Sequence, residues 1–263
     1  MALFIDSEIN DLRDLQRHEC GILDVTSSEQ IDITSKTGLA QELITASILV
    51  FLLRHSSREP GGALFGSQSN WRRRELGVSD VVLTEPLKRW HALKCLELIY
   101  QDAYYNQLND RYKGKWMQYE QRAATAEKQL LQIGIGLVAD PVGKAQPPLL
   151  VAVAGPTPAT SYYVRVAWLN FRGQEGLASD VVGLQTVDGT RLVVSAQQAP
   201  SNASGWNVFA GLTPEGVTLQ NDIPVNKQSD WTIPVTGLRK GRDPGNGQVP
   251  ERYVVNEQVN LRG

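Results

Sequence analysis

The chain has 263 residues, of which 41% are hydrophobic and 21% charged, and its formal net charge is −2. This length allows one large or two modest domains, each with its own core. The small net charge excludes a global field that would draw the whole chain onto nucleic acid or an anionic membrane. Any contact with DNA is therefore expected to be local.

The cysteines and the N-terminal residues indicate a soluble protein made in a cytoplasm. Cys20 and Cys95 lie in different predicted segments without CxxC spacing, so we expect no disulfide framework. The first residues, MALFIDSEIND, lack the cationic start and apolar run of a signal peptide. The most apolar run, Ile48 to Leu53, is far shorter than the roughly 20 residues of a membrane span. We therefore expect no membrane contact.

The first long helix is indicated by apolar residues that recur every three to four positions. Thr37 is a possible N-cap for it. Near the end of this helix, apolar residues cover nearly every side. Two interpretations remain open: it is the central helix of a small bundle, or a neighbouring subunit covers its far side. The apolar positions are Leu39, Leu43, Ala46, Val50 and Leu53.

Residues 59–76 are predicted to form a loop, because they contain a proline, three glycines and no hydrophobic period. Long ordered loops in compact domains are usually functional or flexible. Arg72, Arg73 and Arg74 beside Trp71 are candidates for contact with DNA phosphates or for a position at a channel. An ordinary solvated run of charges is the alternative.

Two further long helices are predicted to form an antiparallel hairpin. The first begins after Thr84, whose hydroxyl can cap it, with Pro86 in the first turn. The second follows a short polar break at Asn109 and Asp110. Its apolar stripe is spaced four and three throughout, and consists of Tyr112, Trp116, Tyr119, Ala123, Ala126, Leu130 and Ile133.

Basic residues cluster at the start of the second helix of the hairpin. This basic face is either simply solvated or opposes an acidic surface of a partner. Its members are Arg111, Lys113, Lys115 and Arg122.

The sequence changes its period near residue 139, where a Pro-rich stretch at 139–148 is predicted to be a linker. Beyond it, short apolar runs with a period of two are separated by Gly, Pro or Asn-Asp breaks, which is typical of a β-sandwich. The fold class is therefore α+β, with a helical domain at 1–138 and a sandwich at 149–248. The predicted strands are Leu149–Val153, Tyr162–Leu169, Ala178–Val187, Arg191–Ser195, Trp206–Ala210, Val217–Gln220 and Trp231–Ile233.

One strand of this half carries a family resemblance. Tyr162, Val164, Val166 and Trp168 fall on one face, which we expect to be buried. The wider set, Tyr162, Val164, Val166, Asn170, Gly173 and Ser179, resembles the penultimate strand and turn of a fibronectin type III-like domain. The later stretches LVVSAQQAPSNASGWNVFAG and WTIPVTGLRKG resemble that domain's second and third strands and the hairpin that precedes its penultimate strand. The resemblance implies an Ig-like sandwich in permuted order, with a surface-recognition or spacer role.

Residues suited to catalysis or metal binding are sparse. His91 and Cys95 share a helix face, but no second pair of ligands joins them. Gly134 and Gly136 lack a preceding strand and are better explained as a helix stop than as a dinucleotide fingerprint. We expect no enzymatic activity, no cofactor and no metal site.

The last stretch, residues 249–263, follows a Gly- and Pro-rich segment and alternates weakly. It is predicted to be either the last strand of the sandwich or an extended arm that pairs with another chain by strand addition.

The helical half resembles the head-to-tail connector (adaptor) proteins of tailed phages. The features that carry this resemblance are a short helix from Asp6 to Leu15, the apolar helix from Leu39 to Leu53, and the hairpin LKRWHALKCLELIYQDAYYNQL and RYKGKWMQYEQRAATAEKQLLQIG. In that family, small helical domains form a ring, usually of twelve, beneath the portal. The ring continues the DNA channel, and a terminal arm commonly reaches the portal.

The resemblance implies a structural protein of the virion neck, assembled in the host cytoplasm. Its partners would be the portal, downstream tail or stopper proteins and further copies of itself in a dodecameric ring, with genomic DNA passing non-specifically. Connectors of this size usually lack a sandwich. Here the sandwich would decorate the outside of the neck. The alternative function is a module that binds carbohydrate or a host surface through the sandwich. The portal or neighbour contacts it implies are Arg111, Lys113, Lys115, Arg122, Arg252, Tyr253, Val254, Val255, Val259, Leu261 and Arg262.

Overall fold

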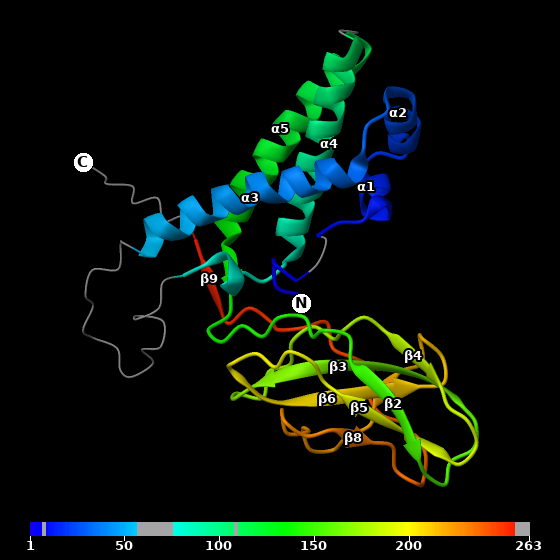
Figure 1. The fold of residues 1–263 in the computed structure, drawn as a ribbon. Helices are drawn as coiled ribbons and strands as arrows, with labels where there is room; N and C mark the ends of the chain where they lie inside the picture. Colours follow the sequence, from blue (N-terminus) through cyan, green and yellow to red (C-terminus); the bar gives the residue numbers. More distant parts are fainter. Residues whose placement is uncertain (7–8, 57–75, 108–109, 256–263) are drawn as a thin grey trace, which may run out of the picture. The chain divides into compact units, whose positions relative to one another are not determined.

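A computed structural model describes residues 1–6, 9–56, 76–107 and 110–255, and these contain five α-helices and several antiparallel sheets. The fold is thus mixed α+β. The chain divides into a helical unit, Glu8–Ala139 with Pro250–Gly263, and a β-rich unit, Met1–Ser7 with Asp140–Val249. Figure 1 labels the five helices and most of the strands. The first residues of the chain therefore belong to the β-rich unit, although they precede the helices. The last residues belong to the helical unit, although they follow the strands.

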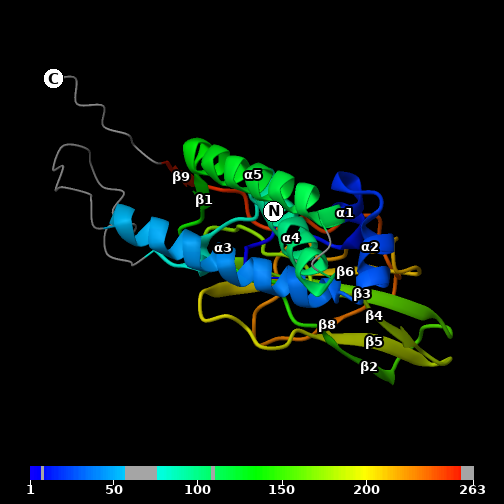
Figure 2. The ribbon, with the colours of Figure 1, turned by 90° about the horizontal axis from the view of Figure 1, so that it is seen from above.

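The helical unit is organised around one helix, α4. Helices α1, α2, α3 and α5 all contact α4, and Figure 2 shows α4 between α3 and α5. The interpretation of the apolar helix α3 as the central helix is therefore wrong, because α3 packs through one side only. The elements in chain order are α1 (Leu12–His18), α2 (Ile22–Glu29), α3 (Ile33–Ser56), the 3₁₀ helix η2 (Val78–Asp80), α4 (Glu85–Gln107) and α5 (Asp110–Ile133).

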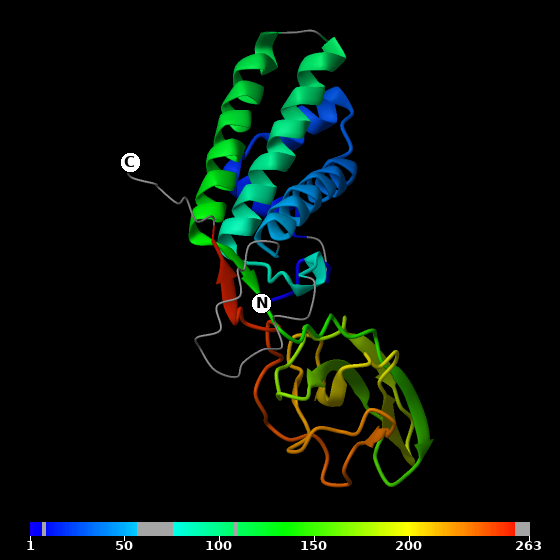
Figure 3. The same ribbon diagram turned by 90° about the vertical axis from the view of Figure 1, so that its left-hand side faces the viewer.

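Helices α4 and α5 form the long antiparallel hairpin, and Figure 3 shows them side by side. Helix α4 begins directly after Thr84, whose carbonyl oxygen accepts from the Lys88 amide at 3.0 Å. The Tyr100 and Tyr119 rings stack across the hairpin with centroids 5.4 Å apart. Five of the seven positions of the predicted stripe of α5 are buried, namely Tyr112, Tyr119, Ala123, Ala126 and Leu130. Trp116 is only partly buried, and Ile133 is exposed.

Local capping decides where the earlier helices begin. The predicted helix from Asp6 to Leu15 is instead α1, because the Asp11 carboxylate accepts from the Asp14 amide at 2.9 Å and starts the helix there. Likewise α3 begins four residues before Thr37. The Asp32 carboxylate accepts from the Thr34 amide at 3.0 Å, and Thr37 lies inside the helix. Helix α2 was not predicted.

The C-terminal strand β9 (Arg252–Val254) pairs with β1 (Ile135–Leu137), the strand that leaves α5. The pairing is antiparallel, with Ile135 opposite Val254. Gly134, at φ +107°, ends α5 and turns the chain into β1. The prediction of a last strand of the sandwich is wrong for β9, because this strand pairs with β1 of the helical unit. The arm that pairs with another chain stays a prediction, and residues 256–263 lie outside the described residues.

The β-rich unit contains two antiparallel sheets. One has the strand order β2-β5-β8 and the other the order β4-β3-β6-β7. The structural strands lie at the predicted places, but the run Ala178–Val187 shortens to four residues. They are β2 (Leu149–Ala154), β3 (Ser161–Asn170), β4 (Val182–Gln185), β5 (Thr190–Ser195), β6 (Ala203–Gly211), β7 (Thr218–Leu219) and β8 (Trp231–Thr232).

Side chains from both sheets pack in one hydrophobic core. The expected buried face of β3 is buried, and Leu192 and Val194 of β5 and Trp206 and Val208 of β6 join it. The stretch predicted as a linker also contributes. Val142 and Ala145 belong to the core. The residues of β3 in the core are Tyr162, Val164, Val166 and Trp168.

The turn after β3 is held by Asn170, which is fully buried. Its side-chain oxygen accepts from the amides of Arg172 and Gln174 at 3.0 and 2.9 Å. Its side-chain nitrogen donates to the Asp140 carbonyl at 3.0 Å. Gly173 in the same turn has φ +73°, a conformation that favours glycine. The Asn and Gly of the fibronectin-like motif thus have a local structural role.

Among the described helices, α3 is the one that is long and apolar enough to cross a membrane, judged by length and composition. The expectation that no segment is long and apolar enough was based on the short run Ile48–Leu53, and it is wrong for the whole helix. The same test is passed by helices that pack inside soluble proteins. Ala40, Ile44, Ile48 and Leu52 of α3 are buried. The absence of a membrane contact stays a prediction.

Candidate functional site

The buried pair His91 and Cys95 has structural contacts. His91 Nδ1 accepts from Asn10 Nδ2 at 2.9 Å, and its Nε2 donates to the Thr37 carbonyl at 3.2 Å, so the imidazole is neutral. Burial lowers the pKa of His91 to about 4 and raises the pKa of Cys95 to about 12. Within the described ranges, no group of three or more His, Cys, Asp or Glu could hold a metal ion. This pair links α3, α4 and the segment before α1.

A basic cleft lies between α1, the start of α4 and the second half of α5. Its main cavity measures about 480 Å³, and a neighbouring cavity of about 260 Å³ shares Arg89, Ala126 and Gln129 with it. We call the two together the basic cleft. Its charged residues are Asp14, Arg17, His18, Glu85, Lys88, Arg89 and Arg122.

The charges of the basic cleft do not cancel. Arg17 pairs with Asp14 at 2.9 Å, and Lys88 pairs with Glu85 at 3.3 Å. Arg89 and Arg122 have no carboxylate partner among the residues that the structure describes, although the Arg122 guanidinium lies 5.6 Å from the Tyr119 ring centroid. These two arginines therefore leave the cleft with an uncompensated positive charge.

The pKa of His18 is affected by this positive charge. Burial lowers its pKa, and the charges of Arg89 and Arg122 lower it further. A site that disfavours a third cation favours an anion for the same electrostatic reason. The basic cleft is therefore suited to carboxylate or phosphate groups.

An acidic cleft of about 280 Å³ lies between α3, α4 and α5. Lys94 Nζ donates to Glu97 Oε1 at 2.7 Å, so these two charges compensate each other. Glu120 and Glu127 have no ion-pair partner in the described parts of the chain. The cleft is lined by Leu43, Ile44, Ser47, Trp90, Lys94, Glu97, Glu120, Ala123, Ala124 and Glu127.

The two clefts lie on opposite flanks of α5. Successive residues of an α-helix are rotated by about 100°, so a buried side centred near Tyr119 places Glu120 and Glu127 on one flank. The same rotation places Arg122 and Gln129 on the other flank. A single helix thus separates the two charge signs.

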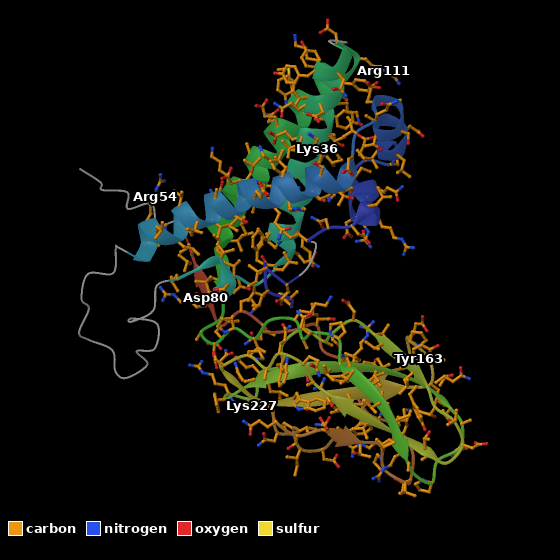
Figure 4. The ribbon with its side chains drawn as sticks, viewed as in Figure 1. Lys36, Arg54, Asp80, Arg111, Tyr163 and Lys227 are labelled. Atoms are coloured by element: carbon orange, nitrogen blue, oxygen red, sulfur yellow. The ribbon has the colours of Figure 1, made fainter. Side chains whose placement is uncertain are left out.

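The residues of the predicted basic face lie on two different sides of α5. Arg111, Lys115 and Arg122 share one side of α5, because they are four and seven residues apart, whereas Lys113 lies on the other side. Figure 4 shows Arg111 near the tip of the hairpin. Of the four residues, Arg122 alone lines the basic cleft.

Lys115 is held by an ion pair with Glu19. Burial acts to raise the pKa of Glu19, but hydrogen bonds from Lys115 and Tyr119 outweigh it, so this pKa is lowered. Lys115 is thus engaged within its own chain rather than available to a partner.

The predicted arm and loop residues fall partly outside the described residues. Arg252, Tyr253 and Val254 form β9, where Val254 is buried and Tyr253 is half-exposed, and Val255 follows the strand. Val259, Leu261 and Arg262, together with Arg72, Arg73 and Arg74, lie outside the described residues.

One flank of α3 exposes apolar side chains beside the acidic cleft. Leu39, Leu43 and Val50 are 39%, 42% and 47% exposed. Their spacing of four and seven residues places them on one side, and Leu43 also lines the acidic cleft. We call these three residues the apolar flank. Leu43 thus belongs to both the apolar flank and the acidic cleft.

Sequence periodicity did not identify the cleft residues outside α5. Arg89, His18 and Arg17 lie on α1 and α4, and only the packing of these helices brings them to Arg122. A signal for Glu120 and Glu127 was present, since they flank the apolar stripe with a seven-residue spacing.

No protein-family model matches the chain, and neither a curated protein nor a solved structure is found to be similar to it. The clefts and the apolar flank are the surface features of the described residues that point to a function.

Proposed function

We propose that the protein is a structural subunit of the head-to-tail adaptor ring of a tailed phage. The ring docks under the portal and continues the DNA channel towards downstream tail or stopper proteins. The observation that carries this proposal is the apolar flank of α3, beside the acidic cleft and on a helical unit with a second, oppositely charged cleft. Surfaces of this kind indicate a protein that functions in contact with other proteins.

Burial of the apolar flank is energetically favourable. Full burial of a Leu or Val side chain contributes about 1.5–3 kcal/mol, and the three residues of the flank are each more than one third exposed. A neighbouring copy is the partner that the adaptor proposal supplies. Rotational symmetry then repeats the same contact around the ring.

The adaptor proposal assigns the remaining parts as follows. The tip of the hairpin, where Arg111 lies, is the proposed contact with the portal, and DNA passes without sequence-specific contacts. The place of action is the neck of the virion, after assembly in the host cytoplasm. No cofactor or catalytic step belongs to this function.

The β-rich unit is proposed to be an Ig-like sandwich in permuted order that decorates the neck. In Ig constant-type domains, the third, penultimate and last strands share one sheet with the penultimate strand in the middle. The resemblance gives the third and penultimate positions to β6 and β3, and β4, which follows β3 in the chain, takes the place of the last strand; β3 lies between β4 and β6. The strand order therefore supports the permuted assignment.

The test is light scattering on the purified chain, alone and mixed with the portal of the same genome. We expect a species that shifts onto the mass of the portal ring. A chain that remains separate from the portal at all mixing ratios contradicts the adaptor function.

A second candidate is a module that recognises carbohydrate or a host surface. It is favoured by Phe171, which is 74% exposed in the turn after β3 and offers an aromatic face. Binding of the full chain to a glycan array, together with a monomeric mass and no portal shift, would favour this candidate.

A further inference from the structure

We infer that neighbouring copies in the ring join head to tail, with the acidic cleft and apolar flank of one copy against the basic cleft of the next. This inference rests on the proposed ring. It adds which surfaces meet, which residues decide the contact and which symmetry the contact has.

The uncompensated charges of the two clefts match each other. In the basic cleft, the pairs Arg17 with Asp14 and Lys88 with Glu85 are internally compensated, which leaves two arginines. In the acidic cleft, the pair of Lys94 and Glu97 is compensated, which leaves two glutamates. Two uncompensated cations on one surface thus match two uncompensated carboxylates on another. The residues that remain are Arg89 and Arg122 against Glu120 and Glu127.

The geometry of α5 allows both carboxylates to bind at once. Glu120 and Glu127 are seven residues apart on one helix, so their backbone positions are separated by about 10 Å along its axis. A rigid helix presents them together, and the basic cleft offers two guanidinium groups that can each bind a carboxylate. His18 adds a polar group that becomes protonated more easily once carboxylates approach it.

The placement of the two clefts also selects the symmetry of the contact. The clefts lie on opposite flanks of α5 and cannot meet within one copy. A two-fold dimer through either cleft would place like charges together, whereas a head-to-tail contact joins opposite charges and closes into a ring when its rotation allows. The apolar flank adjoins the acidic cleft, so the same contact buries Leu39, Leu43 and Val50.

The experiment uses two double variants of the full chain. In the first, Arg89→Glu and Arg122→Glu make both surfaces acidic. In the second, Glu120→Arg and Glu127→Arg make both surfaces basic. Light scattering at low salt should show that each variant self-associates at least about 100-fold more weakly than the wild type.

Mixing is the decisive step. The two variants combined in equal amounts should regain oligomers, because each copy then meets a neighbour of opposite charge on both sides. These oligomers should contain equal numbers of both chains. Because each variant must be folded to assemble in the mixture, regained oligomers also exclude misfolding as the cause of the loss.

A matched control reverses two exposed lysines away from the clefts, Lys128→Glu and Lys227→Glu. It should associate like the wild type. Double variants that assemble like the wild type, or a mixture that stays monomeric while each variant has a wild-type circular dichroism spectrum, would overturn the inference. A wild-type chain that is monomeric at low salt would overturn it too.

These outcomes are distinct from failure of the proposed function. If charge reversal does not change self-association but the chain still binds the portal, only the pairing of the clefts is rejected and the adaptor function is retained. If charge reversal weakens self-association but the chain does not bind the portal, the adaptor function is rejected and the protein is shown to be a self-associating one.

Discussion

Single residues account for the pH dependence that we expect for the helical unit. His91 is 1% exposed, and burial lowers its pKa from 6.5 to about 4. Between these values the unfolded chain binds a proton that the folded chain does not, so stability is lost as the pH falls. The full loss is about 3 kcal/mol at pH 4.

The corresponding prediction concerns the His91→Gln variant. At pH 7.5 the variant should be less stable than the wild type, because Asn10 loses its acceptor. The difference should shrink as the pH falls towards 4.5, since glutamine does not titrate. Urea denaturation at several pH values measures this. A difference that is constant with pH would show that His91 does not titrate as described.

At the scale of secondary-structure elements, the junction of α5, β1 and β9 depends on Gly134. Its φ of +107° favours glycine, and a Cβ there would lie 2.8 Å from Val255 Cγ1. Gly134→Ala should therefore reduce the free energy of unfolding by about 1–3 kcal/mol.

Gly38 provides the matched control for this substitution. It is exposed within α3, and a Cβ added there would meet no atom within 4 Å. Gly38→Ala should increase stability by about 0.5–1 kcal/mol, because alanine favours the helix. Chemical denaturation distinguishes the two effects by sign. Equal effects would mean that β9 does not constrain Gly134.

The elements also differ in how well their periodicity predicts their role. Helix α5 has one apolar stripe and buries most of it, so its orientation follows from the pattern. The second half of helix α3 is apolar on nearly every side, and the pattern there cannot say which side packs. Helix α4 is buried almost all round and was not recognised as central. Its position depends on four partners that sequence spacing does not identify.

At the scale of the whole molecule, the apolar flank should control assembly. Leu39→Gln, Leu43→Gln and Val50→Gln together should weaken self-association at least tenfold, because the interface loses buried apolar area. The thermal unfolding of the monomer should change little, since all three side chains are exposed in it.

Leu49→Gln serves as the control for this triple variant, because Leu49 is also exposed but lies on another flank of α3. It should assemble like the wild type. Sedimentation with anionic lipid vesicles tests the competing role of α3 as a membrane-binding helix. Vesicle binding that the triple variant abolishes, without any change in self-association, would assign the flank to a membrane instead.

The sequence by itself determined the elements whose signals are local. Periodicity located the hairpin helices and most strands of the β-rich unit, and Thr84 and Gly134 marked a helix start and a helix stop. These signals suffice because backbone hydrogen bonds and amphipathic patterns act over a few neighbouring residues.

The tertiary structure alone decided which distant segments meet. It paired β9 with β1, placed Met1–Ser7 in the β-rich unit, put α4 at the centre of the helices, and brought Arg89 to Arg122 and Leu43 to Glu120. Such choices depend on the summed packing of surfaces that lie far apart in the chain. A local pattern of residues contains no information about this long-range packing, so neither cleft could be predicted before the folded chain was known.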